Sequence, residues 1–123
     1  MPKKILIIDD EEDMRVYLET MFRKAGYETR TAVNGQDALE QIRDYAPDLI
    51  TLDILMPQKS GLSCFEALRE HKTTGTVPIM IVSGVTGHSE FFDQTALGGP
   101  TVFLEKPIKP DVVLSRSKEL LGE

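Results

Sequence analysis

Short apolar runs alternate with segments of helical periodicity along the whole chain, and this alternation limits the fold more than any other feature of the sequence. The first run, residues 4–9, is apolar between its first lysine and its final acid and does not alternate, which is typical of a strand buried on both faces. Four more strands are predicted at residues 28–32, 48–53, 78–83 and 101–104. Helical stripes follow each strand, so the expected class is an α/β domain with five strands and five helices.

The helix limits are marked by glycine and proline. Gly26 is expected to end the first helix, Asn34-Gly35 marks a turn before the second, and the last helix is predicted over residues 110–121 with proline in its first turn. The fourth helix is the least clear and is placed between Gly84 and Gly99.

Strands that alternate with helices are joined by right-handed crossovers, so a parallel sheet covered on both faces is expected. In such sheets the ligand lies outside the carboxyl ends of the strands. The polar residues at those ends are Asp9, Asp10, Asp53, Ser83 and Lys106. The sequence thus predicts a site built from three carboxylates, a hydroxyl and an ammonium group.

Three carboxylates without histidine or cysteine form an all-oxygen ligand set, which suits Mg²⁺. Such an ion would also offset the repulsion between Asp9 and Asp10. Lys106 and Ser83 are suited to contact the oxygens of a phosphoryl group. Aspartate carboxylates form aspartyl phosphates, and Asp53 is best placed to do so because it stands alone at the end of a central strand.

Size, charge and cysteine content limit the other functions. The 123 residues are expected to form a single domain, and the net charge of −6 argues against nucleic-acid binding, because phosphates repel an acidic surface. The single Cys64 excludes an internal disulfide and favours a reducing compartment. No apolar run has the length of a membrane span, so a cytoplasmic location is expected. The acids at residues 11–13 are expected to be a solvated first helical turn.

Four groups of residues occur in a fixed order along the chain: the stretch Lys3 to Glu11, Asp53 followed by Met56-Pro57 and Gly61, Ser83-Gly84, and Lys106-Pro107-Ile108. Together these motifs resemble the receiver (REC) domain of two-component response regulators. The resemblance covers essentially the whole chain, residues 1–123. It implies a flavodoxin-like fold with strand order 2-1-3-4-5. It also implies a phosphoryl group taken from a sensor histidine kinase or a histidine phosphotransfer protein.

The resemblance assigns roles around the phosphoacceptor, which would be Asp53. Asp10 would bind Mg²⁺ directly and Asp9 mostly through water. The backbone carbonyl of Leu55 would complete the protein ligands. The chain would not be an enzyme beyond its own aspartyl phosphorylation and dephosphorylation.

The resemblance also implies a conformational switch. Ser83 would be the switch hydroxyl, and Lys106 would pair with the phosphoryl group and precede a cis peptide bond to Pro107. Phe103 matches the aromatic switch position, with plain core packing as the alternative. The output would be a protein-interaction surface around residues 84–121, binding a downstream protein target, a fused output domain or a second copy of the chain. The second copy would bind through the fourth helix, fifth strand and fifth helix.

The segment from Gly84 to Pro100 departs from the family pattern. Its glycines and proline give it a low helix propensity, so the output face is expected to be mobile or shaped for a particular partner. Leu55 and Val85 correspond to positions that flank the route of the attacking water in the family. Both are apolar, so we predict a long-lived phosphoryl group.

Three other functions compete with the phosphoacceptor. A pseudo-receiver would bind partners without being phosphorylated. A magnesium-dependent phosphatase would usually have a second acid where Leu55 stands, and a flavodoxin would have a Ser/Thr-rich phosphate loop in place of the acids after the first strand. The cognate kinase, the signal, and the choice between a stand-alone receiver and part of a longer regulator stay open from the sequence.

Overall fold

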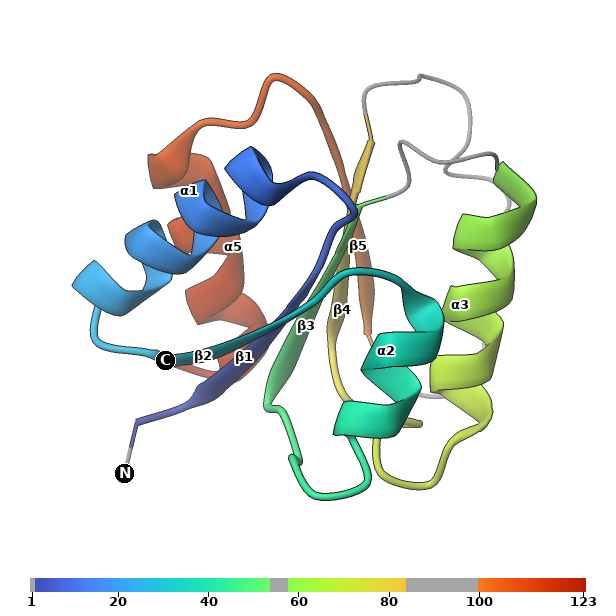
Figure 1. Ribbon diagram of the computed structural model, residues 1–123. Coiled ribbons are helices and arrows are strands. Elements are labelled where there is room, and N and C mark those ends of the chain that lie inside the picture. The colour runs from blue at the N-terminus through green and yellow to red at the C-terminus, as the bar shows by residue number, and fades with distance from the viewer. Residues whose placement is uncertain (1, 54–57, 84–99) are drawn as a thin grey trace.

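The computed structural model describes residues 2–53, 58–83 and 100–123. In these residues a parallel sheet lies between two layers of helices (Figure 1). The elements in chain order are β1 (Lys4–Ile8), α1 (Glu12–Lys24), β2 (Glu28–Ala32), α2 (Gly35–Gln41), β3 (Leu49–Asp53), α3 (Gln58–Glu70), β4 (Ile79–Ser83), β5 (Thr101–Glu105) and α5 (Pro110–Leu121).

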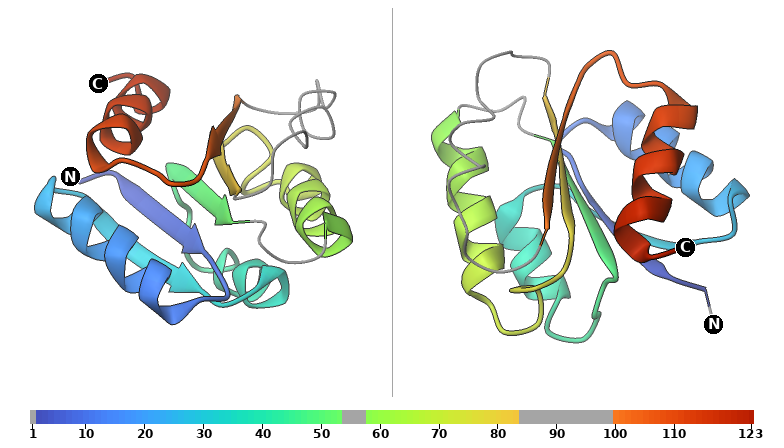
Figure 2. Two further views of the ribbon diagram at one scale, coloured as in Figure 1. Left: turned by 90° about the horizontal axis from the view of Figure 1, so that it is seen from above. Right: turned by 180° about the vertical axis from the view of Figure 1, so that it is seen from behind.

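The five strands pair in parallel in the order β2-β1-β3-β4-β5, which confirms the predicted sheet. Each strand limit lies within one residue of its predicted position. Helices α1 and α5 cover one face of the sheet, and α2 and α3 cover the other (Figures 1 and 2). The described residues contain four helices rather than the five expected, because the segment expected to form the fourth, residues 84–99, lies outside them.

Alternate side chains of a strand enter different cores. In β1, Ile5 and Ile7 pack with residues of α1 and α5, whereas Leu6 and Ile8 pack with residues of α2 and α3. All four residues are buried. Burial on both faces explains why this run is apolar throughout instead of alternating.

The helix ends follow the predicted signals. Helix α1 is followed by Gly26, whose φ of +98° is a conformation that glycine adopts without strain. Helix α5 begins at Pro110, as expected from its sequence. Among the residues that the structure describes, every helix is too short or too polar to cross a membrane.

Asn34-Gly35, predicted as a turn, also starts helix α2. The Asn34 side chain accepts a hydrogen bond from the backbone N–H of Asp37 at 2.8 Å, and the Asp37 carboxylate accepts one from the N–H of Val33 at 3.0 Å. Gly35 permits close packing, because a Cβ at this position would lie 2.9 Å from the Sγ of Cys64 on α3. The pair therefore caps α2 and brings it against α3.

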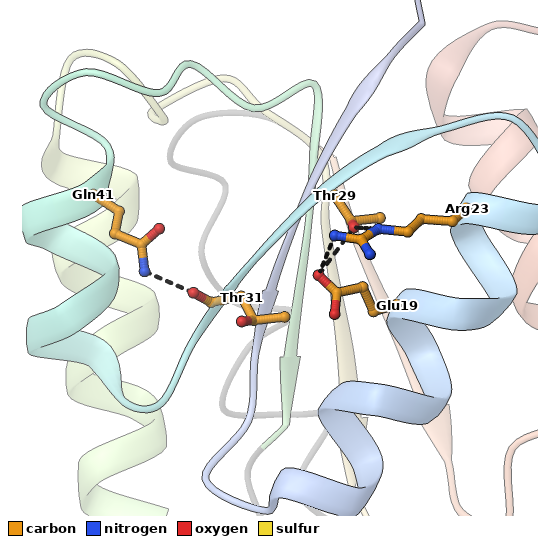
Figure 3. A network of polar contacts seen from close by, with 5 residues as sticks. All are labelled: Glu19, Arg23, Thr29, Thr31 and Gln41. Atoms are coloured by element: carbon orange, nitrogen blue, oxygen red, sulfur yellow. Dashed lines mark hydrogen bonds and ion pairs between the residues drawn. The ribbon is translucent and has the colours of Figure 1, made fainter.

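Side chains from both layers hold the edge strand β2 (Figure 3). From α1, Arg23 donates to the hydroxyl of Thr29 at 2.8 Å, and Glu19 accepts from Arg23 at 3.0 Å and from Thr29 at 3.1 Å. From α2, the Gln41 amide donates to the backbone carbonyl of Thr31 at 2.6 Å. The Gln41 bond satisfies a carbonyl of the kind that an edge strand otherwise leaves to solvent.

Candidate functional site

The sheet brings the carboxyl ends of its strands to one edge, where the sequence predicts the site. Asp9 directly follows β1, Asp53 ends β3, and Ser83 ends β4. Lys106 directly follows β5. Asp53 pairs in register with Val82, the residue before Ser83, so the ends of the two central strands lie side by side.

An ion pair joins Lys106 to Asp53 at this edge. The Nζ of Lys106 lies 2.5 Å from Oδ2 of Asp53, and the two side chains are 15% and 3% exposed. Shielding from water strengthens the attraction between these charges relative to a surface pair. The Lys106–Pro107 peptide bond is cis, as the resemblance implies.

The two carboxylate oxygens of Asp9 have different surroundings. Its Oδ1 accepts a hydrogen bond from the backbone N–H of Glu11 at 2.8 Å. Its Oδ2 is buried and has no hydrogen-bond partner in the part of the chain that the structure describes. Burial, together with the neighbouring carboxylate of Asp53, raises the pKa of Asp9 to about 7. A cation next to this oxygen would relieve both costs, so the residue fits a metal site.

Glu11 belongs to the site, which corrects our expectation that it is only a solvated acid at the start of a helix. One carboxylate oxygen from each of Asp9, Glu11 and Asp53 lies within 4.8 Å of the others. The Oε1 of Glu11 is also 3.9 Å from the Nζ of Lys106. The hydrogen bond from the Glu11 N–H to the Asp9 side chain forms an Asx turn, which fixes the chain beside the strand end. An aspartate at a strand end, with a second acid two residues later, is the sequence signal that could have revealed this.

The other predicted site residues are not shown to join the contacts described above. Asp10 is exposed and is not part of the three-acid group, because consecutive side chains leave a turn in different directions. Its role as a direct metal ligand stays a prediction. Phe103 on β5 is partly buried and packs against the core between the sheet, α2 and α3, and its switch role and that of Ser83 also stay predictions. Leu55 and Val85 lie outside the described residues.

This arrangement of charges is suited to phosphate chemistry. Three acids with only oxygen ligands can hold a hard divalent metal ion. The Lys106 ammonium adds a cation beside the buried Asp53.

A model of one protein family, described as the response regulator receiver domain, matches residues 5–118. The chain belongs to this family.

Relatives that the chain matches over most of their length, and relatives that it matches over only part of it, both agree with this assignment. The chemotaxis protein CheY of Thermotoga maritima is 33% identical over 115 residues, with 93% of each chain covered. PhoP of Bacillus subtilis, the alkaline phosphatase synthesis transcriptional regulatory protein, is 36% identical over 98% of this chain. The chain spans only 49% of the length of PhoP.

Solved structures agree as well. A putative response regulator from Chloroflexus aurantiacus superimposes with a TM-score of 0.84 at 32% identity, with both chains fully covered. The chemotaxis protein CheY4 of Vibrio cholerae gives a TM-score of 0.85 at 27% identity, with 98% of this chain covered. The protein is therefore a receiver domain of two-component signal transduction, a class that interacts with histidine kinases or phosphotransfer proteins. The pseudo-receiver alternative gains no support from these relatives.

Proposed function

We propose that Asp53 takes a phosphoryl group from the phosphohistidine of a sensor histidine kinase or a histidine phosphotransfer protein. The observation that supports this most is the buried carboxylate of Asp53 at the end of central strand β3, 2.5 Å from the Lys106 ammonium. In the reaction an Asp53 oxygen forms the new bond to phosphorus while the phosphorus–nitrogen bond of the donor breaks and the imidazole leaves. The chemistry is limited to phosphorylation and dephosphorylation of this chain, so the receiver is not a turnover enzyme.

The proposed metal is Mg²⁺, held by Asp9, Asp10 and Asp53 with the backbone carbonyl of Leu55. Its contribution when bound is to offset the negative charge of the phosphoryl group. Two observations support a hard divalent ion: a buried oxygen of Asp9 has no hydrogen-bond partner among the described residues, and the donor set consists of oxygens alone. Lys106 supplies a second positive charge, which reduces the repulsion between Asp53 and an incoming phosphoryl group.

The proposed output is a shift in the populations of two conformations. The Ser83 hydroxyl and the Phe103 ring are the proposed moving parts, and the surface around residues 84–121 is the proposed binding face. Its occupant is a downstream protein, a fused output domain or a second copy of the chain. We place this signalling in the cytoplasm, in keeping with the single reduced cysteine.

A mass measurement tests the phosphoacceptor directly. The protein is incubated with acetyl phosphate, with Mg²⁺ or with EDTA, and its intact mass is recorded over time. We expect one phosphoryl adduct that needs Mg²⁺ and is lost in Asp53→Asn. Asp44→Asn is the matched control, because Asp44 is exposed and lies after α2, away from the strand ends that form the site. This variant should form the adduct as the wild type does.

Each other result contradicts part of the proposal. An adduct that persists in Asp53→Asn would place the phosphoryl group elsewhere. The absence of any adduct would favour a pseudo-receiver, and turnover of acetyl phosphate without an adduct would favour a phosphatase. After the donor is removed, the intact mass of the same samples is recorded over time to measure the decay of the adduct. A half-life of seconds with Mg²⁺ would contradict the long phosphoryl lifetime that we predict from Leu55 and Val85.

A further inference from the structure

Lys106 lies between two carboxylates that differ in their surroundings. Its Nζ is 2.5 Å from Asp53, whose side chain is 3% exposed, and 3.9 Å from Glu11, whose side chain is 54% exposed. The first contact is a direct hydrogen bond, whereas the second is an ion pair at longer range. The ammonium group therefore has a primary partner inside the site and a second acceptor at its solvent side.

A metal ion at this site competes with Lys106 for Asp53. The oxygens of Asp9, Glu11 and Asp53 that lie within 4.8 Å of one another are the group that would attract a divalent cation. An ammonium in contact with the same Asp53 carboxylate would repel that cation, since like charges at short range raise the energy of both. Binding of the metal thus requires Lys106 to weaken its contact with Asp53 and to find another partner.

We propose that Glu11 is this second partner, a positioning residue that holds Lys106 at the edge of the site when a metal ion occupies Asp53. The inference rests on the proposed phosphoacceptor function of that site. Glu11 keeps the ammonium close enough to meet an incoming phosphoryl group and prevents it from blocking the metal. This role of Glu11 goes beyond the proposed metal site and beyond the ion pair between Lys106 and Asp53.

The local structure suits Glu11 to this exchange. Its backbone is held at both polar groups, because its N–H donates to the Asp9 carboxylate at 2.8 Å and its carbonyl accepts from the backbone N–H of Arg15 at 3.1 Å. Its side chain is half exposed, so it can follow Lys106 without losing a packed environment. It directly precedes helix α1, where the helix dipole favours a negative charge.

Calorimetric titration with Mg²⁺ tests the exchange in a double-mutant cycle on the full chain. The variants are Glu11→Gln, Lys106→Met and the double variant, with Glu12→Gln as the matched control. Glu12 is the next residue, is exposed and carries the same charge. We expect Glu11→Gln to weaken Mg²⁺ binding about threefold to fivefold, which is the range of a partly exposed ion pair, and Glu12→Gln to weaken it less than about twofold.

The second half of the cycle identifies the mechanism. Lys106→Met should tighten Mg²⁺ binding because it removes the competing cation. In this background Glu11→Gln should weaken binding no more than Glu12→Gln does. Lys106→Gln replaces Lys106→Met in the cycle if the methionine variant does not fold. Acetyl phosphate labelling should also be slower in Glu11→Gln than in Glu12→Gln when Lys106 is present.

Three results would overturn the proposal. If Glu11→Gln weakens Mg²⁺ binding as much in the Lys106→Met background as in the wild type, Glu11 is a metal ligand and not a partner of Lys106. If Glu11→Gln and Glu12→Gln weaken Mg²⁺ binding equally, both glutamates act only as surface charges. If the wild-type protein binds no Mg²⁺, no metal ion displaces Lys106 from Asp53 and the proposed exchange does not occur. Failure of the proposed function is a separate result, because the titration reports on Mg²⁺ and Lys106 even if no phosphoryl adduct forms on Asp53.

Discussion

Two basic side chains, one partly buried and one buried, lie near opposite ends of the sheet and have opposite surroundings. Lys106 follows β5 and faces carboxylates, those of Asp53 and Glu11. Arg69, near the end of α3, faces neutral oxygens where β4 and β5 begin. Its guanidinium donates to the carbonyls of Thr74, Gly75, Val77 and Pro100 and to the hydroxyl of Thr101.

The difference separates a structural cation from a functional one. Neutral acceptors do not titrate in the physiological range and attract no competing metal, so the contacts of Arg69 should not depend on pH or on a metal ion. They also join three segments, the end of α3, the turn before β4 and the start of β5. Lys106 instead lies among three acids that it cannot neutralise alone. That excess of negative charge costs stability and is what allows a second cation to bind.

Removal of each cation should therefore affect different properties, and Arg69→Met should have the largest effect on folding. The substitution removes the side-chain donor from the carbonyls of Gly75 and Val77, and a second donor from two carbonyls that keep a backbone partner, so we expect a loss of about 3 kcal/mol in the free energy of unfolding. Lys106→Met should cost less, about 1 to 2 kcal/mol at pH 6, because Asp9 already holds its proton at this pH and the repulsion among the acids is reduced. Urea unfolding at pH 6 with EDTA measures both values.

Two further variants sharpen this contrast. Arg69→Lys keeps the charge but lacks the planar group that reaches several carbonyls, so it should recover little of the lost stability. Arg43→Met is the matched surface control and should leave the unfolding curve nearly unchanged, because Arg43 is exposed. Equal losses for Arg69→Met and Lys106→Met would show that both cations are structural.

The acid excess around Lys106 predicts a pH dependence. The pKa of Asp9 is about 7 in the folded protein and near 3.8 when unfolded, so the folded state binds this proton more tightly. The stabilisation is complete below about pH 4 and is lost as the pH rises through 7. Between pH 5 and 8 the metal-free protein should lose on the order of 2 kcal/mol, at about 1.4 kcal/mol per pKa unit.

Urea unfolding in EDTA at a series of pH values checks this slope. Asp9→Asn cannot ionise and should flatten it, so that the variant is more stable than the wild type at pH 8 in EDTA. Mg²⁺ should restore the wild type at pH 8 and have little effect on Asp9→Asn. A slope that survives in Asp9→Asn would assign the pH dependence to another group.

The same contrast shows which features the sequence could predict. The strands were found because a run such as 5–8 is apolar on both faces, and each strand limit is correct to within one residue. The convergence of Asp9, Asp53 and Lys106 follows from the rule that strand ends meet at one edge. Both predictions depend on local pattern and topology, which a single sequence carries.

The missed features depend on distant contacts. Glu11 was taken for a solvated helix acid, because the sequence does not show that the turn after Asp9 brings its side chain near Lys106. Arg69 has the pattern of an exposed residue on an amphipathic helix, and its contacts with Thr101 join positions 32 residues apart. No periodicity reports such a pairing. It follows from how α3 packs against the start of β5.

Two buried threonines extend the comparison at a smaller scale. Thr51, two residues before Asp53, has a buried hydroxyl without a hydrogen-bond partner among the described residues. Thr74, in the turn beside Arg69, is also buried, but its hydroxyl donates to the carbonyl of Leu68. Valine has the same shape without the hydroxyl, so the two substitutions should have opposite signs.

We expect Thr51→Val to stabilise the protein by about 1 kcal/mol, because it removes an unpaired polar group, and Thr74→Val to destabilise it by about 1 to 2 kcal/mol. Paired urea unfolding curves at one pH measure the difference. Acetyl phosphate labelling of Thr51→Val should match the wild type, since the Asp53 carboxylate and its pair with Lys106 are retained. A loss of stability in Thr51→Val would show that its hydroxyl has a hydrogen-bond partner in the folded protein.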